Sequence, residues 1–363
     1  MLNLSHFKQG KALHIYIHIP FCESKCPYCA FGSYTDKFDL VQKYFNALEF
    51  EISNFLLNNP NLKISTLFFG GGTPSSVGAE FYAKIFEMLK PKFTKFAEIT
   101  SEANPNSANL KWLTQMREFG LNRISFGAQS FNEKKLKFLG RIHNSSQIHK
   151  AVQNANLVGF KNINLDLIYG SKFDDKKNIE FEISNLEKLQ ISHVSAYSLS
   201  LEDKTPFFGK ENFKKDSVRL ANFLFEKLAN LGFFQYEISN FAKKNKICKH
   251  NLAYWQGKDY AGFGAFSVGT NGLKRLYSAQ NLNEYIKNPL EKKVENLSRF
   301  DKKNEAIFLG ARSIVGINSQ ILNQNELEKA KILTKNKKLK FDGKIFYNQN
   351  YLLADEIALF ITS

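Results

Sequence analysis

The segment from His14 to Cys29, HIYIHIPFCESKCPYC, constrains the fold more than any other part of this sequence. It joins a short apolar run of β-strand character to three cysteines, Cys22, Cys26 and Cys29, which fall within eight residues. Three thiolates on a short loop can hold three irons of a cubane cluster and leave the fourth iron open to another molecule. The segment therefore predicts a metal or redox centre directly after the first strand.

A structural zinc site is the second interpretation of these cysteines. Zinc would need a fourth ligand, for which His18 and Cys248 are candidates, but C-x3-C-x2-C is not the paired C-x2-C of zinc ribbons. Unrelated reduced thiols fit the spacing less well. Only four cysteines occur in the chain, so a disulfide framework is not expected.

Five more apolar, β-prone runs follow this first one, and they begin at Ile64, Ala97, Arg123, Asn162 and His193. Between them lie stretches with helical periodicity, such as 40–57 and 107–120, the second of which ends at a glycine suited to a C-cap. Alternating strands and helices of this kind are typical of successive βα crossovers. We therefore expect an α/β fold whose parallel sheet closes into a partial or complete barrel.

The residues with functional chemistry gather where these runs end. The carboxyl ends of parallel strands share one edge, on which βα barrels assemble their active sites. We therefore expect one shared pocket, with contributions from Cys22, Gly70 to Pro74, Glu102, Gln129, Asp166 and Ser198.

After Leu231 the alternation of β-prone runs and helical stretches changes, which suggests a second, smaller domain packed on the first. No linker rich in proline, glycine or serine marks the transition. We place a core domain at residues 1–235 and a C-terminal domain at residues 236–363.

The net charge of +16 comes from 50 lysines and arginines against 34 acidic residues. The basic residues are spread along the chain without an arginine-rich patch, so nucleic-acid binding is not expected, whereas a weak attraction to anionic membrane surfaces stays open. The N-terminus lacks the pattern of a signal peptide, and no later segment is long and apolar enough to span a bilayer. We expect a cytoplasmic protein.

The cysteine spacing, with aromatic Tyr28 just before the last cysteine, resembles the signature of the radical S-adenosylmethionine (SAM) superfamily. The run Phe69-Gly-Gly-Gly-Thr-Pro74 resembles that superfamily's glycine-rich strand end, which faces the SAM amino group. The resemblance implies a [4Fe-4S] cluster on Cys22, Cys26 and Cys29 that chelates SAM. It also implies a partial (β/α)6 TIM-like barrel with a smaller α+β C-terminal domain.

Over nearly the whole chain, the sequence resembles the family of oxygen-independent coproporphyrinogen III oxidases and their relatives, the heme chaperones. Shared motifs include YIHIPFC, GGGTP, SEANP, SFGAQSF, GRIH and NLDLIYG, with AYSL as a weaker match. The positions that match the family's SAM-contacting residues are Tyr16, Tyr28, Gly71, Gly72, Thr73, Glu102, Gln129, Arg141, Asp166 and Ser198.

Two departures separate this chain from the oxidases. The oxidases carry a further cysteine two residues after the third, where this chain has Phe31, and they have a longer N-terminal extension. Both features predict that oxidase activity is absent, although the sequence leaves open whether the chain is an enzyme at all. Coproporphyrinogen oxidation is kept as the alternative function.

The segment His250-Asn-Leu-Ala-Tyr-Trp255 resembles a motif of the heme-chaperone branch. An imidazole can ligate heme iron, so His250 is a candidate heme ligand, but a packed core residue is an equally good interpretation. A histidine usual in relatives is replaced near Val268, and Cys248 is expected to be a small buried residue. The implied function is to bind heme and pass it to an acceptor protein, at a membrane or elsewhere.

Overall fold

The computed structural model describes residues 7, 12–215 and 218–363. The expectation that the N-terminus lacks a signal peptide falls mostly on residues outside these ranges. Among the described residues, no helix combines the length and the apolar character that a membrane span requires.

The six strands predicted from the sequence form a parallel sheet in chain order, β1 to β6. Their central residues are buried, which explains the apolar runs. These strands are Leu13–Ile19, Ile64–Gly71, Phe93–Ala103, Arg123–Gln129, Ile163–Tyr169 and His193–Ser198. The predicted α/β class is confirmed.

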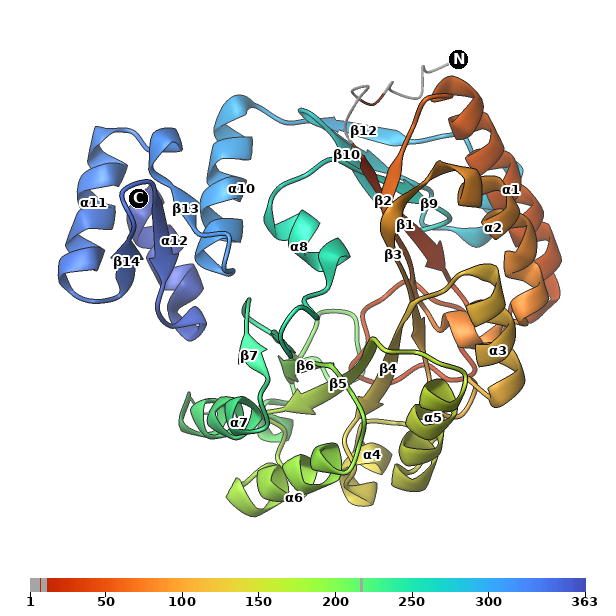
Figure 1. Cartoon of the computed structure of the whole chain (residues 1–363), viewed down its shortest axis with the longest axis horizontal. Helices are drawn as coiled ribbons and strands as arrows, with labels where there is room; N and C mark the ends of the chain where they lie inside the picture. The colour runs from red at the N-terminus through yellow and green to blue at the C-terminus, as the bar shows by residue number, and fades with distance from the viewer. Residues whose placement is uncertain (1–6, 8–11, 216–217) are drawn as a thin grey trace.

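Helices connect these strands and lie on the outer side of the curved sheet (Figure 1). Their ends follow local sequence signals. Asn109 caps the helix Leu110–Phe119, which ends at Gly120 with a φ of 125°, and Asn144 caps the helix Ser145–Leu157. The helices after β1 to β6 are α1 (Val41–Asn58), α2 (Ala83–Leu89), α3 (Leu110–Phe119), α4 (Glu133–Phe138), α5 (Ser145–Leu157), α6 (Lys176–Glu187) and α7 (Val218–Asn230).

The sheet continues past the parallel strands at both edges, to twelve strands within the described residues. At one edge β6 pairs with β8 (Asn240–Ala242), which pairs with β7 (Phe234–Gln235). At the other edge β9 (Tyr260–Phe263) lies parallel to β1 and leads to β10 (Val268–Asn271), β11 (Lys274–Tyr277) and β12 (Lys293–Asn296). The short helix α8 (Lys249–Trp255) lies on the inner side of the curved sheet, and α9 (Leu282–Lys287) packs against α1.

A separate, smaller hydrophobic core lies near the C-terminus and contains Ile307, Ile317, Leu333, Phe346 and Ile357. The elements around it are α10 (Arg299–Ala311), β13 (Ile317–Asn318), α11 (Gln324–Lys335), β14 (Leu339–Phe341), β15 (Ile345–Asn348) and α12 (Ala354–Thr362). Their three strands form an antiparallel sheet of their own. The predicted domain boundary at residues 235/236 stays a prediction, and this packing favours a smaller unit that begins near α10.

Candidate cluster and SAM site

A cavity of about 590 Å³ lies at the carboxyl ends of the parallel strands. The structure brings most of the predicted site residues to its wall: Cys22, Cys26, Tyr28, Cys29, Gly71, Gly72, Thr73, Glu102, Gln129, Arg141, Asp166 and Ser198. Tyr16 and His250 line an adjoining cavity of about 240 Å³, which shares Glu102 and Asp166 with the first. The structure therefore has two adjoining cavities where the sequence predicted one shared pocket.

The three cysteines lie on a loop whose backbone is well fixed. The Cys22 N–H donates to the Tyr34 carbonyl at 3.0 Å, and the Cys29 N–H donates to the Cys26 carbonyl at 3.0 Å. Burial raises the pKa of the Cys22 and Cys29 thiols. Thiolates at such positions need positive partners, which irons supply, so the donor set fits a cubane cluster.

The two candidate fourth ligands for zinc are engaged elsewhere. His18 uses Nδ1 with the Tyr16 hydroxyl at 3.0 Å and Nε2 with the Gly32 carbonyl at 2.8 Å. The Cys248 thiol lies 3.5 Å from a Glu98 carboxylate oxygen, and burial raises its pKa to about 12. This arrangement favours the cluster over zinc.

The glycine-rich strand end packs against the chain that leads into the cysteine loop. The Gly72 N–H donates to the Ile19 carbonyl at 2.8 Å, and the Thr73 N–H donates to the Phe21 carbonyl at 2.7 Å. A Cβ on Gly72 would lie 2.6 Å from the Phe21 carbonyl oxygen. Glycine is therefore required here for backbone packing, in addition to the ligand approach expected from the sequence.

Two partly buried acids, Glu102 and Asp166, line both cavities. Burial and the charge of Asp166 raise the pKa of Glu102 to about 8, and burial raises the pKa of Asp166. Glu102 accepts a hydrogen bond from the Gly71 N–H at 3.1 Å, and Asp166 accepts one from Asn164 at 2.7 Å. Such carboxyl groups are suited to ribose hydroxyls or an amino group.

Arg141 connects the cavity wall to the cysteine loop. Its Nη1 donates to Cys26 Sγ at 3.3 Å, and its Nη2 donates to the Gly127 carbonyl at 2.9 Å and to the Asn104 side chain. Its Nε is buried and has no partner in the described residues. Because Arg141 lines the larger cavity, its guanidinium is placed where a ligand carboxylate could pair with it.

Asn104 and Tyr197 were not predicted from the sequence, although both line the larger cavity. Asn104 follows Glu102 in the SEANP motif, and its Nδ2 donates to Thr73 Oγ1 at 3.2 Å. Tyr197 precedes Ser198, is 42% exposed and lines both cavities. The sequence did offer a signal for both, because each lies within two residues of a predicted site residue at the end of a strand.

The imidazole of His250 is enclosed on α8. Its Nδ1 pairs with Thr66 Oγ1 at 2.6 Å, its Nε2 pairs with the Tyr254 hydroxyl at 2.8 Å, and the ring stacks on Phe68. Burial lowers the pKa of His250 to about 3, so the ring is neutral at physiological pH. Heme ligation by His250 stays a prediction and would require the Nε2 hydrogen bond to break.

Comparison with known proteins identifies the family of the chain. A family model described as the radical SAM superfamily matches residues 16–181. The chain is 35% identical to a protein of Bacillus subtilis (strain 168) named heme chaperone HemW, over 84% of each chain. It is 34% identical to the heme chaperone HemW of Escherichia coli (strain K12), over 71% of this chain and 70% of that protein.

Among solved structures, the coproporphyrinogen III oxidase HemN of Escherichia coli has a similar fold. Its TM-score is 0.81 at 21% sequence identity, and the match covers 96% of this chain and 90% of that chain. The fold, the cysteine loop and the family model define a radical SAM protein, a class that implies a [4Fe-4S] cluster and SAM. Within this class, the chain belongs to the HemW family.

Proposed function

We propose that this chain is a heme chaperone, which binds heme and transfers it to an acceptor protein. The observation that carries the proposal is a cavity with three cysteines in a chain that is 35% identical to a heme chaperone over 84% of its length. In this proposal, Cys22, Cys26 and Cys29 hold a [4Fe-4S] cluster, and exchangeable SAM occupies the cavity.

The proposed SAM contacts follow from the chemistry of the cavity wall. Glu102 and Asp166 accept from hydroxyl or amino groups, Arg141 pairs with the carboxylate, and Tyr28 offers a ring for stacking. The other proposed contacts all line one or both of the adjoining cavities: Tyr16, Gly71, Gly72, Thr73, Gln129 and Ser198. When bound, the cluster and SAM would supply one-electron chemistry.

Phe31 favours the chaperone over the oxidase. It occupies the position of the additional oxidase cysteine, is 69% exposed and lines both cavities. A phenyl ring cannot replace a thiol in redox or ligand chemistry, but it can pack on a flat apolar ligand. Coproporphyrinogen oxidation remains the second candidate, because the solved structure with the similar fold is an oxidase.

The histidines of the chain are the candidate ligands for heme iron. Every imidazole among the described residues already has a hydrogen-bond partner, including His143 with the Ala128 carbonyl and His193 with Tyr236. Both ring nitrogens are engaged in His18, His193 and His250, so ligation by one of these three exchanges a partner for iron, whereas Nδ1 of His143 has no hydrogen-bond partner within the described part of the chain. His250 is the proposed ligand, since the flanking Tyr254 and Phe68 provide aromatic surface.

The test is anaerobic reconstitution with iron and sulfide, followed by titration with heme on the same sample. We expect cluster absorbance that is lost in the Cys22→Ala, Cys26→Ala, Cys29→Ala triple variant, and a saturable Soret band near one heme per chain. A cluster with no heme binding would reject the chaperone proposal. Turnover of coproporphyrinogen III under the same conditions would establish the oxidase instead.

A further inference from the structure

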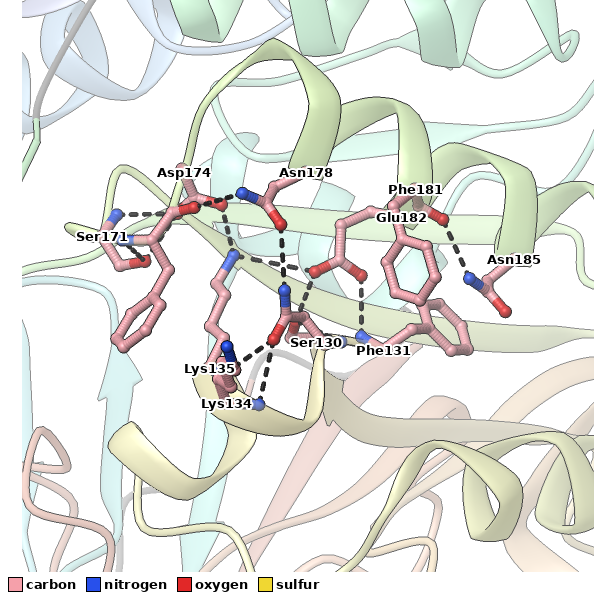
Figure 2. Close-up of polar contacts among 12 residues, drawn as sticks. Ser130, Phe131, Lys134, Lys135, Ser171, Asp174, Asn178, Phe181, Glu182 and Asn185 are labelled. Atoms are coloured by element: carbon pink, nitrogen blue, oxygen red, sulfur yellow. Dashed lines mark hydrogen bonds and ion pairs between the residues drawn. The ribbon is translucent and has the colours of Figure 1, made fainter.

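A buried ion network joins α4 to α6 and to the loop after β5, and it centres on Lys135 of α4 (Figure 2). Lys135 is only 1% exposed. Its Nζ donates to Asp174 Oδ1 at 2.7 Å and lies 3.9 Å from Glu182 Oε1. Lysines are rarely buried in this way unless they are paired, and Lys135 is paired with two buried acids.

The two carboxylates of this network also hold backbone groups. Glu182 accepts from the Phe131 N–H at 2.7 Å and from the Ser130 hydroxyl. Asp174 accepts from the N–H and the hydroxyl of Ser171 at 2.8 and 2.7 Å. The network therefore ties the segment that follows β4 to the loop after β5 and to α6 (Figure 2).

Stability alone is a weak reason for such a network. Desolvation of buried charges offsets most of their attraction, and apolar replacements of a whole buried ion group are often neutral or stabilising. A fixed geometry is the better-supported use of buried ions. The element fixed here is α4, which has six residues and is too short to be stable without tertiary contacts.

The segment that follows α4 packs against the cysteine loop. A Cβ on Gly140 would lie 2.5 Å from Pro27 Cδ, so the two backbones meet closely. The Gly140 carbonyl lies 3.9 Å from Cys26 Sγ, and the next residue, Arg141, donates to the same sulfur at 3.3 Å. Phe138, at the end of α4, packs on Phe207.

We propose that the Lys135–Asp174–Glu182 network positions α4 so that Arg141 donates to Cys26 Sγ, and that this sets the reduction potential of the cluster. The inference rests on the proposed cluster on Cys22, Cys26 and Cys29. Hydrogen bonds to ligand sulfurs stabilise the more negative, reduced state and raise the potential. Lys135 is thus a positioning residue that acts through Arg141.

The experiment compares cluster midpoint potentials and the EPR spectra of reduced, reconstituted protein. The neutral variant is Lys135→Met with Asp174→Asn and Glu182→Gln, and its matched control is Lys134→Met, an exposed lysine on the same helix. We expect a lower potential in the neutral variant, a shift of the same sign in Arg141→Met, and the wild-type value in Lys134→Met. Adding the neutral substitutions to Arg141→Met should give no further shift.

A wild-type potential in the folded neutral variant would overturn the inference, as would shifts that simply add in the combined variant. If the neutral variant does not fold, Ser130→Ala removes one hydrogen bond to Glu182 and keeps every charge. It should lower the potential by a smaller amount, and an unchanged potential would again overturn the inference. Wild-type protein that forms no cluster would reject the proposed function as well, which distinguishes the two failures.

Discussion

At the scale of single residues, Glu102 links the cavity to the pH dependence of stability. Its pKa is raised to about 8 from an ordinary value of 4.5. Between these values the folded state binds more protons than the unfolded state, so the free energy of unfolding falls as pH rises. In SAM-free protein, Glu102→Gln should remove on the order of 2 kcal/mol of this decline. Urea unfolding at a series of pH values measures this decline, and Glu187→Gln, at an exposed position, is the control. If the free energy of unfolding falls equally steeply with pH in wild type and in Glu102→Gln, the prediction is wrong.

His250 offers a second prediction at this scale, because both ring nitrogens are occupied. If His250 ligates heme, Tyr254→Phe removes the hydrogen bond that competes with iron for Nε2. A net hydrogen bond contributes about 1 kcal/mol, so heme should bind roughly fivefold more tightly. Heme titration of Tyr254→Phe and His250→Ala measures this. Unchanged Soret spectra and affinities in both variants would place the ligand elsewhere.

At the scale of elements, the glycine-rich end of β2 and the cysteine loop form one packed unit. In Gly72→Ala, the new Cβ would lie 2.6 Å from the Phe21 carbonyl oxygen and 2.8 Å from the Ile19 carbonyl oxygen. These are backbone atoms, which cannot move aside as a flexible side chain can. We expect a loss of roughly 2–4 kcal/mol of stability together with reduced iron content after reconstitution.

The control for this substitution is Gly159→Ala. Gly159 has a φ of 91°, but no atom would lie within 4 Å of an added Cβ, so only backbone strain of about 1 kcal/mol is expected. Thermal unfolding and iron analysis compare the two variants. Full iron content in Gly72→Ala would show that the two elements are not coupled.

The elements also show what a sequence can predict. Strands β1 to β6 were predictable because buried parallel strands give continuous apolar runs, and their ends gathered the cysteines, glycines and acids. The position of α8 was not predictable, since the contact between Thr66 and His250 spans 184 residues. For the same reason nothing local indicated that β9 pairs with β1 or that Lys135 forms an ion pair with Glu182 of α6.

At the scale of the whole molecule, the elements after Leu231 belong to two different structures. Strands β7 to β12 extend the main sheet, whereas α10 to α12 surround their own core (Figure 1). The contacts that join them include backbone hydrogen bonds, such as the one from the Ile314 N–H to the Tyr236 carbonyl at 2.8 Å. We therefore propose that the unit from α10 onward can unfold while the sheet and the cysteine loop persist.

Ile357→Ala tests this proposal, because Ile357 is buried in the smaller core. The lost side chain should cost about 2–4 kcal/mol, confined to residues 299–363. Hydrogen exchange should accelerate there, with α8, β9 and cluster absorbance unchanged. The matched variant Ile124→Ala, in the main core, should accelerate exchange in β1 to β6 and reduce cluster retention. Faster exchange from residue 236 onward in Ile357→Ala would instead support the boundary predicted from the sequence, since α8 and β9 would then unfold together with the C-terminal helices.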